Sequence, residues 1–269
     1  MSSKGTVEKA VTRAGWALKS FQDWTGYRRR RASFKAETRG AQHYTIEAPQ
    51  GARPRHTYTI ADGKLLTTFQ MDQRHRIVER LYPQKLTSLL DIGCCRGWFV
   101  INAALRPECE RATGIDVVQG FIDAANDAKR VLKLDKAEFH YAFVEDVAND
   151  PVKFRTPYQT IVMLNVYHYM YWGSAESDHH QADHDSLLRM LAGICTDRIV
   201  FLCPLEVEEC PSDISRRAQK HPEWAANYTT EKFMEAASRY FDVSFDSRLG
   251  LRPLYLMKKK QTGSSGPQA

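Results

Sequence analysis

No stretch of this sequence approaches the ~20 consecutive apolar residues that a membrane-spanning helix requires. The N-terminus also lacks the uninterrupted apolar core of a secretory signal. These two absences predict a cytoplasmic protein without a transmembrane segment. They leave open a peripheral position at the inner membrane surface.

Cysteine is present, but no Cys-x-x-Cys pair occurs. The six cysteines are Cys94, Cys95, Cys109, Cys195, Cys203 and Cys210. In a chain of 269 residues this pattern favours reduced thiols in a reducing compartment. We therefore expect neither a disulfide framework nor a zinc site.

Positive charge is concentrated near the N-terminus. Residues 1–56 hold twelve Lys and Arg against four Asp and Glu, whereas the chain as a whole has a net charge of +6. The remaining 213 residues are therefore slightly acidic. The run Arg28–Arg31 has three possible roles: binding an anionic membrane surface, binding nucleic acid, or forming a solvated basic face.

Strand and helix patterns alternate through most of the chain. Short apolar runs predict buried strands at Ser88–Ile92, Ala112–Val117, Glu138–Ala142, Thr160–Asn165 and Arg198–Cys203. Helical periodicity lies between them, at Trp98–Leu105, Val118–Leu132 and Ser186–Cys195. A last helix at Thr229–Phe241 and two strands joined near Gly250 complete the pattern. It predicts a doubly wound, seven-stranded, mostly parallel sheet with a C-terminal antiparallel hairpin.

A helical and irregular N-terminal extension precedes this domain. We expect an amphipathic helix over 6–24, an irregular arm over 38–63 and a helix over 66–81. The predicted domain organisation is a basic N-terminal helix and arm over 1–65, a Rossmann-like domain over 66–260, and a disordered polar tail over 261–269.

The sharpest chemical signal is the segment Leu89–Phe99, where an apolar strand enters a turn with two glycines and a helix follows at once. Gly93 and Gly97 leave room for a ligand beside the backbone. Nineteen residues beyond Gly97, a second apolar strand ends at Asp116, which is placed to accept hydrogen bonds from ribose hydroxyls. This spacing fits either a dinucleotide or S-adenosylmethionine.

The glycine pattern separates these two ligands. A dinucleotide fingerprint needs Gly-x-Gly-x-x-Gly, whereas this chain has Gly93-x-Cys95-x-Gly97. With Asp91 in front, the segment resembles motif I of the class I S-adenosylmethionine-dependent methyltransferases, with Cys95 in place of the middle glycine. The resemblance implies that Asp91 orients the methionine end of the cofactor and Asp116 holds its ribose.

The resemblance also implies a wider set of cofactor-binding residues. The set is Asp91, Gly93, Cys94, Cys95, Gly97, Asp116, Val117, Phe143, Val144, Glu145 and Asn165. Where the family places an acidic residue for the adenine amino group, this chain has Phe143, so the adenine could stack there. Glu145 or Asp146 would then reach its amino group.

Two histidine-containing segments follow. His168 lies just after the fourth predicted strand, where the family lines the transferred methyl group and the acceptor. It could be a general base for a hydroxyl acceptor or a pocket residue with its hydrogen bonds satisfied. His179, His180 and His184 could ligate a metal, but their polar surroundings favour an acceptor-side loop, and no metal site is expected.

The predicted function is methyl transfer from S-adenosylmethionine to an oxygen or nitrogen of a small-molecule or glycan-type acceptor. The acidic body and the aromatic segment Tyr167–Trp172 favour such an acceptor. Two alternatives remain. One is an RNA methyltransferase that uses the basic N-terminal arm, and the other is a non-catalytic binding protein that keeps the fold.

Overall fold

The computed structural model describes residues 42–44, 58–61, 63–67, 69–174, 177–250 and 252–261. The chain divides into two compact units, Met1–Arg74 and His75–Ala269, which we describe separately. The helix expected over 6–24, the run Arg28–Arg31 and the tail from residue 262 lie outside the described residues.

The first unit contains a small antiparallel sheet. Its strands, in spatial order, are β1 (Gln42–Tyr44), β2 (Tyr58–Ala61) and β3 (Lys64–Thr67). The expectation of an irregular arm was wrong for these residues, because Asp62-Gly63 is a two-residue hairpin signal. Ala61 pairs directly with Lys64, and Gly63 has a φ of 71°. Helix α2 therefore begins only at Phe69 (Phe69–Glu79), three residues later than expected.

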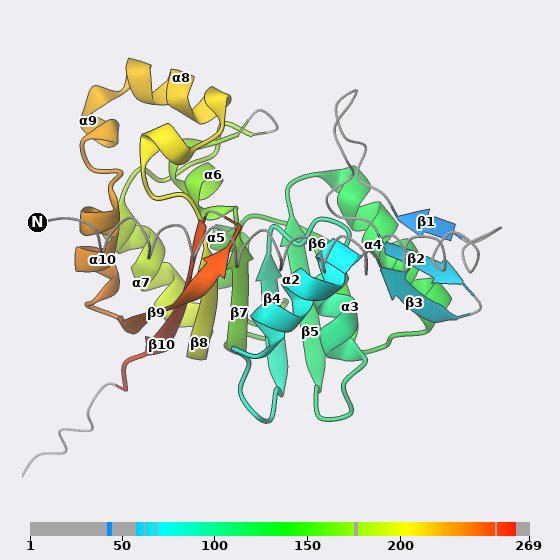
Figure 1. Ribbon diagram of the computed structural model, residues 1–269. Coiled ribbons are helices and arrows are strands. Elements are labelled where there is room, and N and C mark those ends of the chain that lie inside the picture. Colours follow the sequence, from blue (N-terminus) through cyan, green and yellow to red (C-terminus); the bar gives the residue numbers. More distant parts are fainter. Residues whose placement is uncertain are drawn as a thin grey trace, which may run out of the picture. The chain divides into compact units, whose positions relative to one another are not determined.

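The second unit is built on a seven-stranded sheet with the order β6-β5-β4-β7-β8-β10-β9 (Figure 1). Five strands are parallel: β4 (Ser88–Ile92), β5 (Arg111–Asp116), β6 (Ala137–Tyr141), β7 (Tyr158–Leu164) and β8 (Cys195–Leu202). The last two, β9 (Phe241–Leu249) and β10 (Arg252–Lys259), form an antiparallel hairpin, and β10 pairs with β8. This architecture confirms the predicted fold class.

Helices cover both faces of the sheet because most of its strands are apolar on both sides. Helices α3 (Trp98–Ala104) and α4 (Gln119–Leu132) pack against β5 and β6. Helices α5 (Val144–Asn149), α7 (His184–Ile194) and α10 (Thr230–Ala237) contribute to the large core cluster. Alternate strand residues such as Leu90 and Ile161 belong to that cluster, whereas Leu89 and Val162 are buried outside it.

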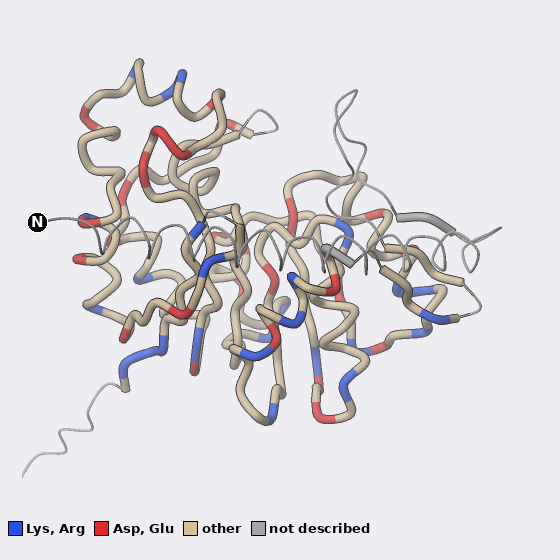
Figure 2. The backbone as a smooth tube through the Cα atoms, viewed as in Figure 1, with Lys and Arg blue, Asp and Glu red and all other residues tan. Residues whose placement is uncertain are grey.

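A group of short helices that the sequence analysis did not anticipate follows β7 and β8. It consists of α6 (Tyr167–Trp172), the 3-10 turn η1 (Val207–Glu209), α8 (Ser212–Lys220) and α9 (Pro222–Ala225). Helix α6 packs against α8, and Figure 1 shows these helices together at one end of the sheet. An aromatic contact joins α6 to α9, with the ring centroids of Trp172 and Trp224 6.0 Å apart. Acidic residues line η1 (Figure 2), and Glu208 and Glu209 are exposed.

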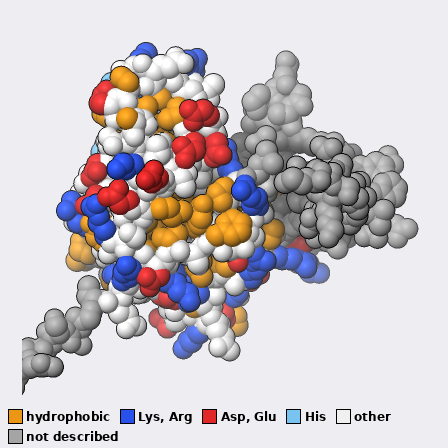
Figure 3. Space-filling model, turned by 60° about the vertical axis from the view of Figure 1, so that its left-hand side comes forward, with side chains coloured by type: hydrophobic (Ala, Val, Ile, Leu, Met, Phe, Trp, Pro, Cys, Tyr) orange, Lys and Arg blue, Asp and Glu red, His pale blue; other side chains and the backbone are white. Residues whose placement is uncertain are grey.

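Strand β9 forms one edge of the seven-stranded sheet and carries charge along it. Asp242 and Arg248 are exposed, as is Phe245 at 59%. Charged side chains on an edge strand discourage pairing with another chain. On the face of the molecule shown in Figure 3, a group of hydrophobic side chains is surrounded by charged side chains.

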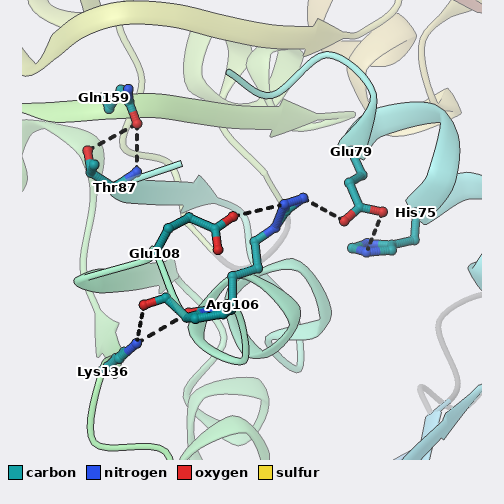
Figure 4. A network of polar contacts seen from close by, with 8 residues as sticks. His75, Glu79, Thr87, Arg106, Glu108, Lys136 and Gln159 are labelled. Carbon is teal, nitrogen blue, oxygen red and sulfur yellow. Dashed lines mark hydrogen bonds and ion pairs between the residues drawn. The ribbon is translucent and has the colours of Figure 1, made fainter. Parts of the chain in front are cut away.

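A polar network joins the end of α2 to the loops at the amino edge of the sheet (Figure 4). Arg106 Nη2 contacts Glu79 Oε1 at 2.8 Å, and Glu79 Oε2 lies 3.5 Å from His75 Nε2. Lys136 Nζ donates to the Arg106 carbonyl at 3.2 Å. These contacts hold the amino edge of the sheet, at the end opposite the predicted site.

Candidate active site

The predicted site lies where the strand order reverses direction. From β4 the chain proceeds outward to β5 and β6, and then returns to β7 on the other side of β4. In doubly wound sheets, ligands bind at the carboxyl ends of the strands that flank such a switch point. The loop after β4 and Asn165 after β7 occupy these ends.

The loop between β4 and α3 has a tightly wound backbone. Gly93 and Gly97 have φ values of 72° and 80°, and Cys95 has 51°. At the end of β7, Asn165 has a φ of 62°. Left-handed conformations strain residues other than glycine, and such strain is typical of functional sites. Two of the four described non-glycine residues with positive φ thus lie at this switch point.

The two loop glycines make room for neighbouring side chains of the protein. A Cβ on Gly97 would lie 2.4 Å from Cε1 of Phe139, and a Cβ on Gly93 would lie 2.8 Å from Cγ2 of Val166. The sequence analysis assigned these glycines to the approach of a ligand. In the structure, packing against Phe139 and Val166 is itself sufficient reason for glycine at both positions.

Asp116 ties this loop to the tip of β5. One carboxylate oxygen accepts a hydrogen bond from the Cys95 amide at 2.8 Å, and the other accepts from the Val118 amide at 3.0 Å. The side chain is 8% exposed. A carboxylate has about four lone-pair positions, so it can accept more hydrogen bonds than these two. Val117, the next residue, is half-buried.

Asp91 and Cys94 are buried residues of the same region. Asp91 is 3% exposed within β4, between Gly114 of β5 and Val162 of β7. The Cys94 side chain packs against Gly114, where an added Cβ would lie 2.8 Å from its sulfur. Burial first, and then the charge of Asp91, raise the pKa of the Cys94 thiol. Cys94 is therefore a protonated core residue.

The segment after β6 places Phe143 and Glu145 together with a residue that the sequence analysis did not assign. The imidazole of His179 lies 4.5 Å from the Phe143 ring, and its Nε2 lies 3.3 Å from Glu145 Oε1. Asp146 accepts a hydrogen bond from the Phe143 amide at 2.8 Å and so caps α5. Val144 is buried in the core cluster. Glu145 is consequently better placed than Asp146 to meet a ligand beside Phe143.

His168 is held inside the protein by a cysteine. It is 1% exposed, and its Nδ1 lies 3.0 Å from the sulfur of Cys203, which also accepts from the His168 amide. Desolvation, and then the positive charge of Arg252, lower the pKa of His168 to about 3. Burial raises the pKa of the Cys203 thiol. The imidazole is thus neutral, and the protonated thiol can donate to Nδ1.

Asn165 is oriented from the C-terminal hairpin. Its amide oxygen accepts a hydrogen bond from Arg252, the first residue of β10, and its backbone amide donates to the Leu202 carbonyl at 2.6 Å. Because β10 is antiparallel to β8, it starts at the same edge of the sheet at which β7 and β8 end. The hairpin therefore places the guanidinium of Arg252 beside Asn165 at the switch point.

Comparison with solved structures identifies the fold. Two crystal structures of WbdD, one described as a bifunctional kinase-methyltransferase, match 69% of this chain at a TM-score of 0.50, with 18% and 19% identity. The seven-stranded sheet of this chain, mostly parallel with an antiparallel C-terminal hairpin, is of the type found in class I methyltransferases. This chain has the class I methyltransferase fold. The matched region covers about 40% of the longer WbdD chain.

The N-methyltransferase NodS from Bradyrhizobium japonicum WM9 is 15% identical, with 71% of this chain and 97% of that chain covered at a TM-score of 0.48. No family model matches the sequence, and no curated protein matches it either.

Within the methyltransferase fold, the predicted residues fall into groups. Gly93, Cys95, Gly97 and Asp116 meet at the ends of β4 and β5, and Asn165 lies beside them at the end of β7. Phe143 and Glu145 follow β6, the neighbour of β5. The side chains of Cys94 and Val144 point into packed core, so only their backbones could face a cofactor.

The three histidines considered as metal ligands have separate neighbours. His179 contacts Glu145, and His180 Nδ1 lies 2.6 Å from the Asp178 carbonyl. His184 is buried, and its Nδ1 lies 2.7 Å from the Tyr167 hydroxyl. Among the described residues, no three His, Cys, Asp or Glu side chains form a group suited to a metal.

Sequence reasoning missed Arg252 and Cys203, and it considered His179 only as a possible metal ligand or as part of an acceptor-side loop. A signal for Arg252 was available: it is the second residue after Gly250, where the hairpin turns back from the carboxyl edge. Cys203 directly follows β8 at that edge. His179 carried no such signal, because a loop position does not predict which strand end a side chain reaches.

Proposed function

We propose that this chain transfers a methyl group from S-adenosylmethionine to an oxygen or nitrogen of a small-molecule or glycan-type acceptor. The observation that carries the proposal is the tie between Asp116 and the Cys95 amide at the switch point of a class I methyltransferase fold. It fixes the glycine loop beside a carboxylate of the kind that accepts hydrogen bonds from ribose hydroxyls.

The described residues fit this cofactor. Asp116 would accept hydrogen bonds from the ribose, Phe143 offers a ring face for the adenine, and Glu145 offers an acceptor for the adenine amino group. Gly93, Cys95 and Gly97 would line the cofactor through their backbone. Asp91 would orient the methionine end of the cofactor.

S-adenosylmethionine, when bound, supplies a methyl group already activated by the sulfonium charge. The chain's own task is then to align the acceptor and exclude water, which can lower a barrier by roughly 7–11 kcal/mol. The segment Tyr167–Trp172 does not offer its aromatic rings to an acceptor as expected, because Tyr167, Tyr171 and Trp172 are fully buried in the core cluster. Asn165 and the half-buried Tyr169 are the residues after β7 that could meet an acceptor there. His168 would serve this alignment as a hydrogen-bond donor, because a neutral imidazole with a pKa of about 3 is a weak base.

We further propose that the protein acts in the cytoplasm, and that the methyltransferase domain is the second unit, which begins at His75 and not at residue 66 because β3 (Lys64–Thr67) belongs to the first unit. In the described part of the chain, no helix has the length and apolar character needed to cross a membrane.

Calorimetry with S-adenosylhomocysteine, S-adenosylmethionine and NAD tests the cofactor. We expect the two adenosyl compounds to bind and NAD not to bind. Asp116→Ala should weaken binding by about 1.5–3 kcal/mol, the range for hydrogen bonds to a charged group. Asp123→Ala, which removes an exposed aspartate from α4, is the matched control and should bind as the wild type does.

Because Asp116 also holds the loop, the melting temperature of each variant must be measured beside its affinity. A folded Asp116→Ala variant with wild-type affinity for S-adenosylhomocysteine would contradict the assignment of Asp116. Tight binding of NAD with no response to either adenosyl compound would overturn the proposed function.

A further inference from the structure

Arg252 is a half-buried guanidinium whose charge no described carboxylate neutralises. Its side-chain hydrogen bond goes to a neutral acceptor, the amide oxygen of Asn165. In the nearby acidic turn, Glu206 accepts a hydrogen bond from the Thr230 amide at 2.9 Å, and no ion pair joins Arg252 to Glu208 or Glu209 in the described part of the chain. Arg252 therefore keeps most of its donors and its full charge at the switch point.

His168 supplies a second donor within electrostatic range of this guanidinium, because the charge of Arg252 contributes to the lowered pKa of His168. With the Cys203 thiol donating to Nδ1, the imidazole proton resides on Nε2. Nε2 is buried and has no hydrogen-bond partner in the described part of the protein. A buried N–H without a partner is costly, so an acceptor placed at Nε2 would be stabilising.

Asn165 supplies the third donor. Its amide oxygen already accepts from Arg252, which leaves the amide nitrogen as the donor of this side chain. Its backbone is fixed through the Leu202 carbonyl and a left-handed φ of 62°. Three side chains, from the residue after β7, from α6 and from β10, thus carry donors at one edge of the sheet, with the acceptors among them already used.

We propose that Arg252, His168 and Asn165 bind an anionic oxygen group, a carboxylate or a phosphate, carried by the methyl acceptor. A set made only of donors, one of them charged, is complementary to oxyanions and to no cationic group. Neutral sugars or apolar rings would leave the guanidinium unpaired. This inference rests on the proposed function, because it takes the edge after β7 as the acceptor side.

Ligand-observed NMR of the full chain with saturating S-adenosylhomocysteine tests the site. Inorganic phosphate is followed by phosphorus line broadening and acetate by saturation transfer, so that the two probes distinguish a phosphate from a carboxylate. We expect at least one probe to bind in the millimolar range. Arg252→Gln should weaken that binding at least ten-fold, because charge-assisted hydrogen bonds are the strong ones.

Two more variants sharpen the test. Asn165→Asp places a carboxylate against Arg252 and should weaken probe binding at least ten-fold, as Arg252→Gln does. Lys258→Gln removes an exposed positive charge from the same strand and should leave probe binding within two-fold of the wild type. Probe binding that is absent, or equal in all four proteins, would overturn the proposal.

The affinity for S-adenosylhomocysteine, measured on every variant, separates the possible failures. A ten-fold loss in Arg252→Gln, with phosphate or acetate competing against S-adenosylhomocysteine, would assign the donors to the cofactor's own carboxylate and overturn the acceptor site. Absence of S-adenosylhomocysteine binding in the wild type would instead overturn the proposed function, while the dependence of probe binding on Arg252 remains measurable.

Discussion

Cys95 and Asn165 hold backbone conformations that glycine adopts more easily. Each is fixed by a long-range hydrogen bond: the Cys95 amide donates to Asp116, and the Asn165 amide donates to the Leu202 carbonyl. A left-handed residue with a side chain costs roughly 1–2 kcal/mol, which the surrounding structure must offset. The strain is therefore located at the ends of β4 and β7, where the proposed reaction takes place.

His168 and His184 are buried in neutral form, and this predicts a loss of stability in mild acid. Desolvation lowers their pKa values to about 3 and about 4. In an unfolded chain the pKa of histidine is ~6.5. At a pH between the folded and the unfolded pKa values, the unfolded chain therefore binds more protons than the folded one. Stability is thus complete above pH 6.5 and should fall by about 1.4 kcal/mol per pH unit for each histidine as the pH decreases.

Urea unfolding at pH 7.0, 6.0 and 5.0 measures this slope. His168→Gln should reduce the slope, because one of the two neutral imidazoles is gone. His221→Gln, whose wild-type side chain is 42% exposed, is the control and should keep the wild-type slope. Equal slopes in the wild type and His168→Gln would contradict the burial of a neutral His168.

At the scale of elements, the glycines of the loop between β4 and α3 also allow close packing of helices against the sheet. Gly97 precedes α3 and brings its backbone against the ring of Phe139 in β6 and the methyl group of Ala125 in α4. Gly114 similarly lets Cys94 lie against β5. A glycine pattern that matches a cofactor motif can therefore reflect helix–sheet packing as well as ligand approach.

Gly97→Ala should destabilise the protein by about 2–4 kcal/mol, because a Cβ at 2.4 Å from Phe139 forces overpacking and φ is 80°. The matched control is Gly193→Ala in α7, where a Cβ meets nothing within 4 Å. There alanine should stabilise by roughly 0.5–1 kcal/mol. The free energies of unfolding by urea measure both, and a Gly97→Ala variant as stable as the wild type would contradict the described packing.

At the scale of the whole molecule, charge and cofactor machinery are separated along the chain. The excess of Lys and Arg precedes residue 57, whereas every described residue assigned to the cofactor follows residue 90. Changing Arg28–Arg31 to Ser should therefore leave the affinity for S-adenosylhomocysteine within two-fold of the wild type. Any binding of the full chain to anionic vesicles or to RNA should fall, since it depends on these charges.

Calorimetry and co-sedimentation at several salt concentrations measure the two effects. The membrane and nucleic-acid roles separate by which polyanion the wild type binds. If the four-Ser variant binds both like the wild type, the run is a solvated face. A large loss of cofactor affinity in this variant would show that the N-terminal residues contribute to the site.

The sequence by itself determined the alternating architecture and the strand–glycine–helix motif. Period and spacing within some 30 residues specify these features: an apolar run, a turn with glycine, and an acidic residue at the tip of the next strand. The hairpin at Gly250 followed from equally local signals. The small N-terminal sheet was also within reach, since Asp62-Gly63 is a two-residue turn signal.

Only the tertiary structure decided which side chains meet. Asn165 and Arg252 are 87 residues apart, and His168 and Cys203 are 35 apart. Their encounters depend on strand order and on the direction of β10, which no local pattern specifies. Burial likewise fixed the chemistry of His168, because the same imidazole in water would titrate near neutral pH. Sequence spacing acts along the chain, whereas desolvation and charge act through space.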